Sequence, residues 1–231
     1  MKKKIAIITG ASRGIGRETA KILAKNNIHI IIVSRTLSSL EQLHDEVLEI
    51  NGSCTIVQMD ICDSNGIFEL SNEVKKRWGK LDFLISSTGH LHNLTPITHF
   101  DENEWIKSFN INVFAVWKLI KCFESLLLKS QKGRAIFLTP DLKKINRQFW
   151  GGYSASNSAL NSLIKIWSAE ISHSTIKANI FVPKPTKTNL RKVAYPGELN
   201  KNLLEPNKVA YEIFRVLKDN SYKNGETIFM E

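Results

Sequence analysis

The stretch IAIITGASRGIG, residues 5–16, decides the fold, because an apolar run of strand length leads directly into a turn rich in glycine. Gly10, Gly14 and Gly16 let the backbone turn tightly and come close to a bound pyrophosphate. A helix is expected over residues 16–27, and its N-terminus offers free N–H groups and a partial positive charge. In this strand–turn–helix context the glycines predict a dinucleotide-binding site, with a purely structural turn as the alternative.

Beyond this turn, apolar runs of strand length alternate with amphipathic stretches of helix length. Strands are expected at residues 5–9, 28–34, 54–60, 81–87, 133–139, 176–182 and 226–230. Helices are expected at residues 16–27, 37–52, 101–129, 153–172 and 206–218, with one more passing through residues 75–77. Strands that are apolar on both faces and separated by helices indicate a parallel sheet covered on both sides. The pattern predicts a doubly wound α/β fold.

Length and composition favour a single domain. A chain of 231 residues, with 42% hydrophobic and 23% charged residues, fits one soluble α/β domain with a sizeable core. Neither an internal repeat nor a low-complexity linker divides the chain, so residues 1–231 are predicted to form one NAD(P)-binding domain. The only long irregular stretch, residues 184–205, is too long for a routine connection and is a candidate lid.

The net charge of +10 admits a polyanionic partner, but the lysines are scattered and only residues 2–4 form a run. We therefore expect a solvated basic surface and no nucleic-acid partner. The N-terminal apolar run has about five residues against the ~7–15 of a signal-peptide core, and no run approaches the ~18 of a membrane span. We expect a cytoplasmic protein with no membrane partner and with Cys54, Cys62 and Cys122 reduced.

Two arginines indicate which dinucleotide is bound. Arg35 follows the second predicted strand, where many NAD-preferring sites carry an acidic residue for the ribose 2′-OH. Arg13 lies within the glycine turn, and guanidinium groups match the geometry of a phosphate. The pair favours NADP(H), whereas side chains pointing to solvent would leave NAD(H) open. Asp60, after the third strand, is placed either to accept from the adenine amino group or to cap the next helix.

The remaining motifs resemble those of the short-chain dehydrogenase/reductase family. After TGASRGIG come MDI (59–61), SSTG (86–89), NINV (110–113), YSASN (153–157) and VPKPTKT (182–188), in the family's order and spacing over essentially the whole length. The resemblance implies a Rossmann-type sheet of seven parallel strands in the order 3-2-1-4-5-6-7. The cofactor contacts that it implies are Gly10, Ser12, Arg13, Gly14, Ile15, Gly16, Arg35, Asp60, Ile61, Gly89, Asn157, Pro183 and Thr188.

The family's catalytic group is a tetrad of Asn, Ser, Tyr and Lys, and this chain matches two of its members. Asn112 corresponds to the asparagine that holds a relay water, and Tyr153 to the tyrosine that exchanges the proton. The serine that orients the carbonyl is replaced by Pro140. The lysine that holds the nicotinamide ribose and lowers the tyrosine pKa is replaced by Asn157. Structural readings also exist, with Tyr153 as a packing residue and Asn112 as a buried asparagine at a helix kink.

The two replacements change the expected chemistry. An unperturbed tyrosine has a pKa near ~10 and is a poor base at neutral pH. A cation about 4 Å away contributes on the order of 4 kcal/mol at an effective dielectric constant of ~20, or roughly three pKa units. Asn157 carries no charge, Pro140 donates no hydrogen bond, and Thr139 is expected to face the opposite side of the strand. A loss of about 10³-fold or more in rate is expected for the ordinary mechanism.

Other residues near the site have both a functional and a structural reading. His90 and His92 follow SSTG and either border the substrate pocket, where histidine acts as an acid near neutral pH, or pack in its wall. No third ligand accompanies them, so no metal site is predicted. Four residues of the candidate lid either reach the cofactor or substrate or are solvated: Lys184, Lys187, Lys192 and Tyr195.

Two functions follow from these observations. The first is an NADP(H)-dependent oxidoreductase that acts on a small carbonyl or alcohol through a slow or modified site. The second is a non-catalytic dinucleotide-binding module or scaffold. The resemblance also implies a homodimer or homotetramer through the helices at 101–129 and 153–172, whose apolar faces exceed what one sheet face needs. These faces include Val113, Trp117, Ile120, Leu160, Leu163 and Trp167.

Overall fold

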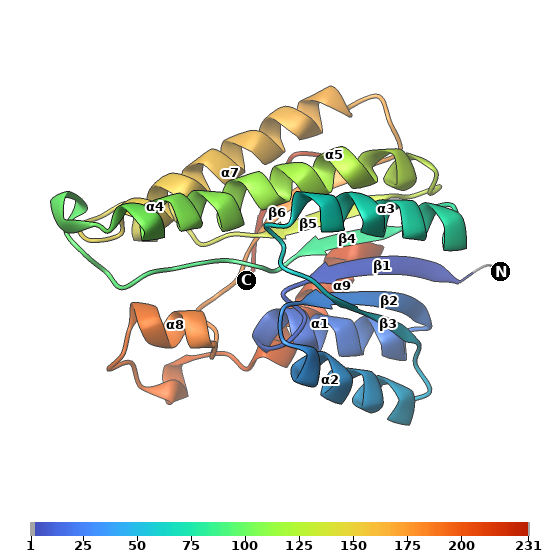
Figure 1. The fold of residues 1–231 in the computed structure, drawn as a ribbon, viewed down its shortest axis with the longest axis horizontal. Helices are drawn as coiled ribbons and strands as arrows, with labels where there is room; N and C mark the ends of the chain where they lie inside the picture. The colour runs from blue at the N-terminus through green and yellow to red at the C-terminus, as the bar shows by residue number, and fades with distance from the viewer. Residues whose placement is uncertain (1–2, 231) are drawn as a thin grey trace.

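The computed structural model describes residues 3–230 and places seven parallel strands in one sheet with helices on both faces (Figure 1). The strand order is β3-β2-β1-β4-β5-β6-β7, as predicted. The strands are β1 (Lys4–Thr9), β2 (Ile28–Ser34), β3 (Cys54–Gln58), β4 (Phe83–Ser86), β5 (Arg134–Leu138), β6 (Lys177–Val182) and β7 (Thr227–Phe229). The order reverses between β1 and β4, and such a switch point opens a crevice at the carboxyl ends of the strands.

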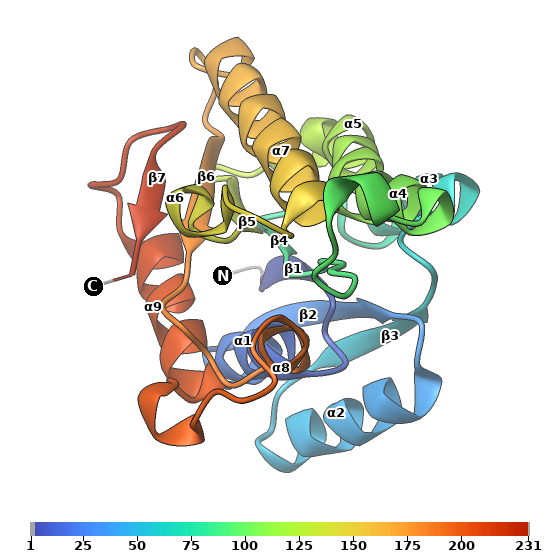
Figure 2. The same ribbon diagram turned by 90° about the vertical axis from the view of Figure 1, so that its left-hand side faces the viewer.

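The helices alternate with the strands as the apolar periodicity predicts. The longer ones are α1 (Gly14–Lys25), α2 (Leu37–Glu49), α3 (Ser64–Trp78), α4 (Glu102–Phe109), α5 (Ala115–Leu128), α7 (Gly151–Glu170) and α9 (Pro206–Lys218). The shorter ones are α6 (Leu142–Ile145), α8 (Asn189–Ala194) and the turns η1 (Ile97–His99) and η3 (Asn200–Asn202). Figure 2 views the carboxyl edge of the sheet, where α6 and α8 lie in front of the strands.

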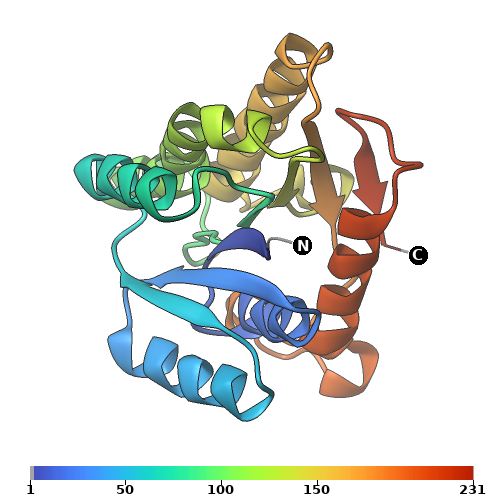
Figure 3. The same cartoon turned by 90° about the vertical axis from the view of Figure 1, so that its right-hand side faces the viewer.

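The two faces of the sheet carry two separate apolar cores. Successive side chains of a strand point to opposite faces, so Ile5 and Ile7 of β1 pack in one core and Ala6 and Ile8 in the other. The first core receives side chains from α3, α5 and α7, and the second from α1, α2 and α9. Figure 3 shows these two helical layers from the amino edge. The central strands are buried on both sides, which explains their unbroken apolar sequence.

The helix predicted at residues 101–129 is one continuous helical segment with a wider turn inside it. Helix α4 runs into the π-helical turn η2 (Asn110–Phe114), and α5 follows directly. Such π-turns often occur at functional sites. Asn112 lies within this turn and is 2% exposed, so the reading of a buried asparagine at a helix irregularity is correct for its position.

The candidate lid, residues 184–205, contains more regular structure than the sequence suggested. It carries α8 and η3, and its two ends pair with each other through a bridge between Thr186 and Leu204. The Lys187 N–H donates to the Leu204 carbonyl, and the Leu204 N–H donates to the Pro185 carbonyl, both at 2.9 Å. Helix α8 has only six residues, too few for a helical period to stand out in the sequence.

Candidate active site

A cavity of about 860 Å³ opens at the carboxyl edge of the sheet, at the switch point between β1 and β4. Loops that follow six of the strands form its walls, together with the start of α7 and the segment with α8. Eleven of the thirteen predicted cofactor contacts line it: Gly10, Ser12, Arg13, Gly14, Ile15, Arg35, Asp60, Ile61, Gly89, Pro183 and Thr188. The fold therefore brings together residues from five separate parts of the chain in one cavity.

The glycine turn takes the shape that its sequence predicts. Gly10 and Gly14 have φ angles of 69° and 57°, in the left-handed region that favours glycine. A Cβ atom on Gly10 would lie 2.9 Å from the backbone oxygen of Ser87. Gly16 lies outside the cavity wall, and a Cβ there would collide with the Gly10 carbonyl. Gly16 therefore supports the site by letting α1 pack on the turn, and it does not border the cavity.

The N-terminus of α1 faces the cavity without a side chain to satisfy its N–H groups. Arg13 is the N-cap residue and makes no side-chain capping hydrogen bond, and the first turn contains no acidic residue. The first N–H groups of a helix lack partners inside the helix and attract anions. Arg13 lines the cavity beside these groups. This end of the cavity fits the pyrophosphate of a dinucleotide.

The far end of the cavity carries one basic and one acidic side chain. Arg35 and Asp60 both line it, and their side chains, 66% and 48% exposed, approach each other at 3.8 Å. One carboxylate oxygen of Asp60 accepts from the Cys62 N–H at 2.9 Å. The helix cap is Asp63, which accepts from the N–H groups of Asn65 and Gly66. The helix-cap reading of Asp60 is therefore wrong, and its second oxygen remains directed to Arg35.

Two threonine hydroxyls on the cavity wall are buried and have no hydrogen-bond partner within residues 3–230. They belong to Thr9 at the end of β1 and Thr139 just after β5. Thr139 borders the cavity, as Pro140 does, and its N–H continues the pairing of β5 with β6 by donating to the Phe181 carbonyl at 3.1 Å. The Thr9 and Thr139 hydroxyls are both closed to solvent, so neither reaches a molecule in the cavity. A buried hydroxyl without a partner costs free energy.

Tyr153 lies on the cavity wall near the start of α7, within a small apolar cluster. It is 8% exposed and packs with Ile145, Trp150 and Ala194. Across the described chain, its hydroxyl makes no hydrogen bond with another residue, and burial raises the pKa of Tyr153 above its ordinary value of 10. No charged group offsets this rise. The phenol is thus held as a neutral acid.

The structure also places Pro140 and Asn157, which stand where the family has its serine and its lysine. Pro140 lines the cavity and offers no donor. Asn157 is 4% exposed, and its amide donates to the Tyr153 carbonyl at 2.9 Å, one turn back along α7. It does not reach the cavity wall. The contact between Asn157 and a cofactor therefore remains a prediction that this side-chain arrangement does not favour.

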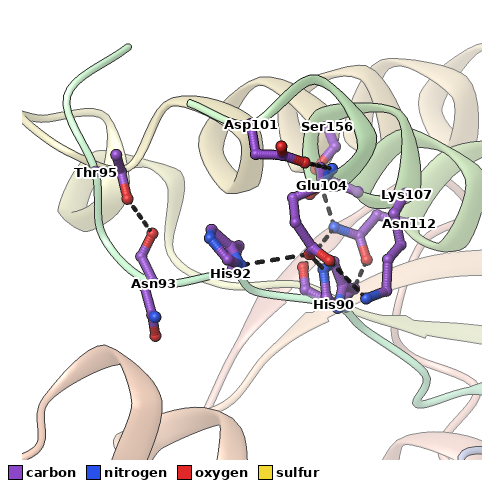
Figure 4. A network of polar contacts seen from close by, with 10 residues as sticks. His90, His92, Asn93, Thr95, Asp101, Glu104, Lys107, Asn112 and Ser156 are labelled. Carbon is purple, nitrogen blue, oxygen red and sulfur yellow. Dashed lines mark hydrogen bonds and ion pairs between the residues drawn. The ribbon is translucent and has the colours of Figure 1, made fainter. Parts of the chain in front are cut away.

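A polar network joins the loop after β4 to α4, η2 and α7 (Figure 4). The Asn112 amide oxygen accepts from the His90 N–H at 2.8 Å, and its nitrogen donates to the His90 carbonyl at 3.0 Å. The same nitrogen donates to Ser156 Oγ at 2.9 Å, and Ser156 Oγ donates to the Tyr153 carbonyl at 3.2 Å. Asn112 thus lies behind the wall, where it fixes the backbone of His90 relative to α7.

The structure adds cavity residues that sequence patterns did not indicate. The segment after Pro140 contributes Asp141, Lys144, Ile145 and Trp150, and the candidate lid adds Arg191. Basic side chains outnumber acidic ones on this wall: Arg13, Arg35, Lys144, Lys184, Lys187, Arg191 and Lys192 against Asp60, Asp141 and Glu205. The available signal was the density of lysine and arginine in the two segments. Such a wall favours an anionic ligand.

The candidate lid is held over the cavity by a group of charged and aromatic side chains. Arg191 forms two hydrogen bonds with the Glu198 carboxylate, at 2.6 and 2.7 Å, and lies 3.8 Å from the centre of the Tyr195 ring. Arg147 donates to the Tyr195 hydroxyl at 2.8 Å. These contacts connect α8 to the segment between α6 and α7, so Tyr195 belongs to the closed end of the cavity.

The described residues contain neither a metal-binding cluster nor a membrane-spanning helix. Among residues 3–230, no group of three or more His, Cys, Asp or Glu side chains is arranged to hold a metal ion. None of the helices in the same range has both the length and the apolar composition that crossing a membrane requires.

Comparison with known proteins gives consistent matches. A family model described as short chain dehydrogenase matches residues 4–198. Over 209 residues the chain is 27% identical to the uncharacterised oxidoreductase YciK of Escherichia coli (strain K12), covering 89% of this chain and 82% of that protein. It is 28% identical over 237 residues to the 3-oxoacyl-[acyl-carrier-protein] reductase FabG of Buchnera aphidicola subsp. Schizaphis graminum, with coverage of 99% and 96%.

Solved structures that resemble this fold include nucleotide complexes. One is a short chain dehydrogenase from Shigella flexneri 2a complexed with NADP, with a TM-score of 0.91 and 27% identity, covering 99% of this chain and 97% of that chain. Another is a short chain dehydrogenase from Escherichia coli CFT073 complexed with NADPH, with a TM-score of 0.91, 26% identity and the same coverage.

Proposed function

This chain belongs to the short-chain dehydrogenase family, and from that premise we propose that it is an NADP(H)-dependent oxidoreductase with a modified site. Its substrate in this proposal is a small carbonyl compound or the corresponding alcohol. One observation carries the proposal: eleven predicted nucleotide contacts, from distant parts of the chain, line one cavity. The N-terminus of α1, which has no side-chain cap, supports a bound nucleotide there.

NADP(H) is preferred to NAD(H) in this proposal because of the two arginines at the nucleotide end. A 2′-phosphate adds negative charge where Arg13 and Arg35 line the cavity. Asp60 sets a limit, since its carboxylate lies 3.8 Å from Arg35 and competes for the guanidinium. The related structures with bound NADP and NADPH agree with this preference without deciding it.

The chain's own residues set the direction in which such a site works best. When bound, the nicotinamide supplies or accepts a hydride. Tyr153 is neutral in its apolar cluster, and the charged form of a tyrosine is disfavoured by burial. At neutral pH it is a protonated phenol that cannot act as a base and, with a raised pKa, is a weak acid, so reduction of a carbonyl is impaired less than oxidation of an alcohol. Pro140 offers the carbonyl no hydrogen bond, so ordinary turnover is expected to be slow.

The same observations favour a second candidate, a nucleotide-binding module without catalysis. The Tyr153 phenol has no cation offsetting its burial, and the family's lysine position holds Asn157, whose amide is engaged by the helix backbone. A partner that recognises nucleotide occupancy would then be the functional target. Turnover distinguishes the two candidates, because both bind NADPH.

The test measures NADPH affinity and turnover on a panel of carbonyl compounds, for the wild type and for the Pro140→Ser/Asn157→Lys double variant. The wild type is expected to bind NADPH and to turn over slowly, and the double variant to gain activity. Gly10→Ala is expected to lose NADPH binding, because its Cβ would meet the Ser87 carbonyl. Fast turnover by the wild type contradicts the slow site, and absent NADPH binding contradicts the cofactor.

A homodimer or homotetramer in the cytoplasm is part of the same proposal. Of the apolar residues predicted for the contact, Trp117 is 42% exposed, whereas Ile120, Leu160 and Trp167 are buried in the chain's own core. Other exposed apolar side chains on α4, η2, α5 and α7 extend the face: Ile106, Phe114, Leu128 and Ile166. Light scattering of the wild type and of Trp117→Glu tests the contact, and identical monomeric masses contradict it.

A further inference from the structure

His90 lies on the cavity wall, in the loop that follows β4. It directly follows Gly89, and both residues line the cavity. The His90 side chain is 18% exposed, so it reaches the cavity while most of its surface is covered. Histidine exchanges its proton near neutral pH more readily than any other side chain.

A carboxylate orients the imidazole ring of His90 (Figure 4). Nε2 of His90 lies 2.7 Å from Oε2 of Glu104 on α4. The other carboxylate oxygen of Glu104 accepts from Lys107 Nζ at 2.8 Å, and the Glu104 N–H donates to Asp101 at 3.0 Å, which caps the helix. Glu104 is thus fixed on both its side chain and its backbone, and a fixed carboxylate sets the tautomer of its histidine.

The backbone of His90 is fixed as well. Asn112 holds the N–H and the carbonyl of His90 at 2.8 and 3.0 Å, and it is linked through Ser156 to the backbone of Tyr153. Two long-range contacts, to α4 and to η2, therefore hold one residue of a loop. A residue that only packs in the cavity wall would need neither of these two contacts. A histidine held by a carboxylate in a cavity has the arrangement of a general acid–base group.

The free ring nitrogen is the reactive one in this arrangement. Glu104 accepts from Nε2–H, so Nδ1 carries the proton that the ring gains or loses. Nδ1 of His90 has no hydrogen-bond partner anywhere in the described part of the chain. His92 shares the carboxylate more weakly, with Nδ1 3.4 Å from Glu104 Oε2, and it does not line the cavity. Of the two histidines, His90 lines the cavity and His92 does not, and proton exchange with a bound ligand requires a side chain on the cavity wall.

We propose that His90, oriented by Glu104, exchanges the proton with the substrate oxygen in this site. The inference rests on the proposed oxidoreductase function. In reduction, a bound reduced dinucleotide would supply the hydride to the carbonyl carbon, and the C=O π electrons would form the new O–H bond with the proton that leaves His90 Nδ1. The products are the alcohol, the oxidised dinucleotide and a neutral imidazole, which regains its proton from water. Glu104 acts as a positioning residue.

Several charged groups lie on the elements around this exchange. Glu104 and Lys107 lie on α4, His92 on the same loop, and Tyr153 on α7. From the other walls of the cavity, α6 and its N-cap residue contribute Lys144 and Asp141, and the segment with α8 contributes Arg191, Lys184, Lys187 and Lys192. Glu104 contacts the His90 ring directly, so replacing its carboxylate tests what orients that ring.

The test compares His90→Gln, Glu104→Gln and the control His92→Gln in the full-length protein with NADPH. His90→Gln is expected to lower carbonyl turnover by about 100-fold or more, the effect of a lost general acid, with NADPH affinity within about twofold of the wild type. Glu104→Gln is expected to lower turnover as well, because a carboxylate no longer holds the ring, and His92→Gln to change neither turnover nor NADPH affinity. Nitrogen NMR of the His90 ring, without cofactor, should show the Nε2–H tautomer in the wild type and a mixture of tautomers in Glu104→Gln.

The outcomes separate this inference from the proposed function. If the wild type turns over and His90→Gln retains its rate and pH profile, the histidine inference is wrong and the oxidoreductase stands. If the wild type binds NADPH but reduces no carbonyl, the proposed role of His90 and Glu104 and the proposed oxidoreductase function are both wrong, and the nucleotide site stands. If Glu104→Gln leaves the tautomer of His90 unchanged, the positioning role of Glu104 is wrong.

Discussion

Replacing Asn157 by lysine puts an ammonium group one helical turn from Tyr153, where the side chain at 157 is buried. Residues four apart on a helix have Cβ atoms about 5–6 Å apart, and the Asn157 amide already reaches the Tyr153 carbonyl at 2.9 Å. A lysine ammonium held about 4 Å from the phenol oxygen would stabilise the phenolate by about 4 kcal/mol at an effective dielectric constant of ~20. That energy corresponds to a pKa lowered by about three units.

The starting point makes the effect measurable. Burial raises the pKa of Tyr153 above its ordinary value of 10, with no charge to oppose it, so the wild-type phenol is expected to stay neutral until strongly alkaline pH. In Asn157→Lys the same phenol is expected to ionise several pH units earlier. The substitution also removes the hydrogen bond to the Tyr153 carbonyl, worth about 1 kcal/mol, and buries a charge. Some loss of unfolding free energy is therefore expected.

The assay is a spectrophotometric titration of tyrosinate. Each background is measured with and without Tyr153→Phe, so that the difference isolates this phenol from the other tyrosines. Asn157→Met is the matched control, because its side chain has similar length and no charge, and it should leave the titration at the wild-type position. Circular dichroism defines the pH range in which each variant stays folded. Equal titrations in Asn157→Lys and Asn157→Met, both folded, would refute the electrostatic argument.

A wild-type result also bears on the argument. A Tyr153 phenol that ionises well below pH ~10 in the unmodified protein would show that a cation already reaches it. The absence of a lysine at position 157 would then have no chemical consequence, and the expected gain of the double variant would disappear.

Three further predictions concern the nucleotide end and the lid. Gly16→Ala is expected to lower the unfolding free energy by about 1–3 kcal/mol, because its Cβ meets backbone atoms that cannot rotate away; denaturant unfolding measures this, and Gly197→Ala, with open space around the Cβ, is the control. Arg35→Ala is expected to weaken NADPH binding by about tenfold or more and to leave NADH binding unchanged, so calorimetry with both nucleotides should show a changed ratio. The hydrogen bond from Arg191 holds the pKa of Glu198 below its usual 4.5, so the pair stabilises the lid fully above that pH and loses its effect as the pH falls through the lowered pKa. Proteolysis in the lid of wild type and Glu198→Gln should therefore differ at neutral pH and converge once the pH falls below the lowered pKa of Glu198, and an equal difference at both pH values would contradict the role of this pair.

The fold was predictable because its determinants are local. The alternation of apolar runs with amphipathic stretches specifies strands and helices, and strands that are apolar on both faces require cover on both sides of a parallel sheet. The spacing of Gly10, Gly14 and Gly16 likewise specifies a turn, since positive φ angles at the first two favour glycine. Predicted element positions therefore agreed with the structure within a few residues.

The candidate site was predictable in its position and less so in its side chains. Thr139 borders the cavity together with Pro140, yet its hydroxyl is closed to solvent, which strand alternation alone does not show. Gly16 and Asn157 occupy the expected places in the chain, yet neither borders the cavity. Helix α8 in the candidate lid gave too short a pattern to recognise.

The sequence by itself determined the sheet, the glycine turn and the replacement of two catalytic residues by Pro140 and Asn157. Only the tertiary structure decided that His90 meets Glu104 and Asn112, which follow it by 14 and 22 positions. It also decided that the Tyr153 phenol is buried without a cation. The physical reason is that hydrogen bonds between distant residues and the burial of an ionisable group depend on how helices pack on the sheet, which no local pattern of residues specifies.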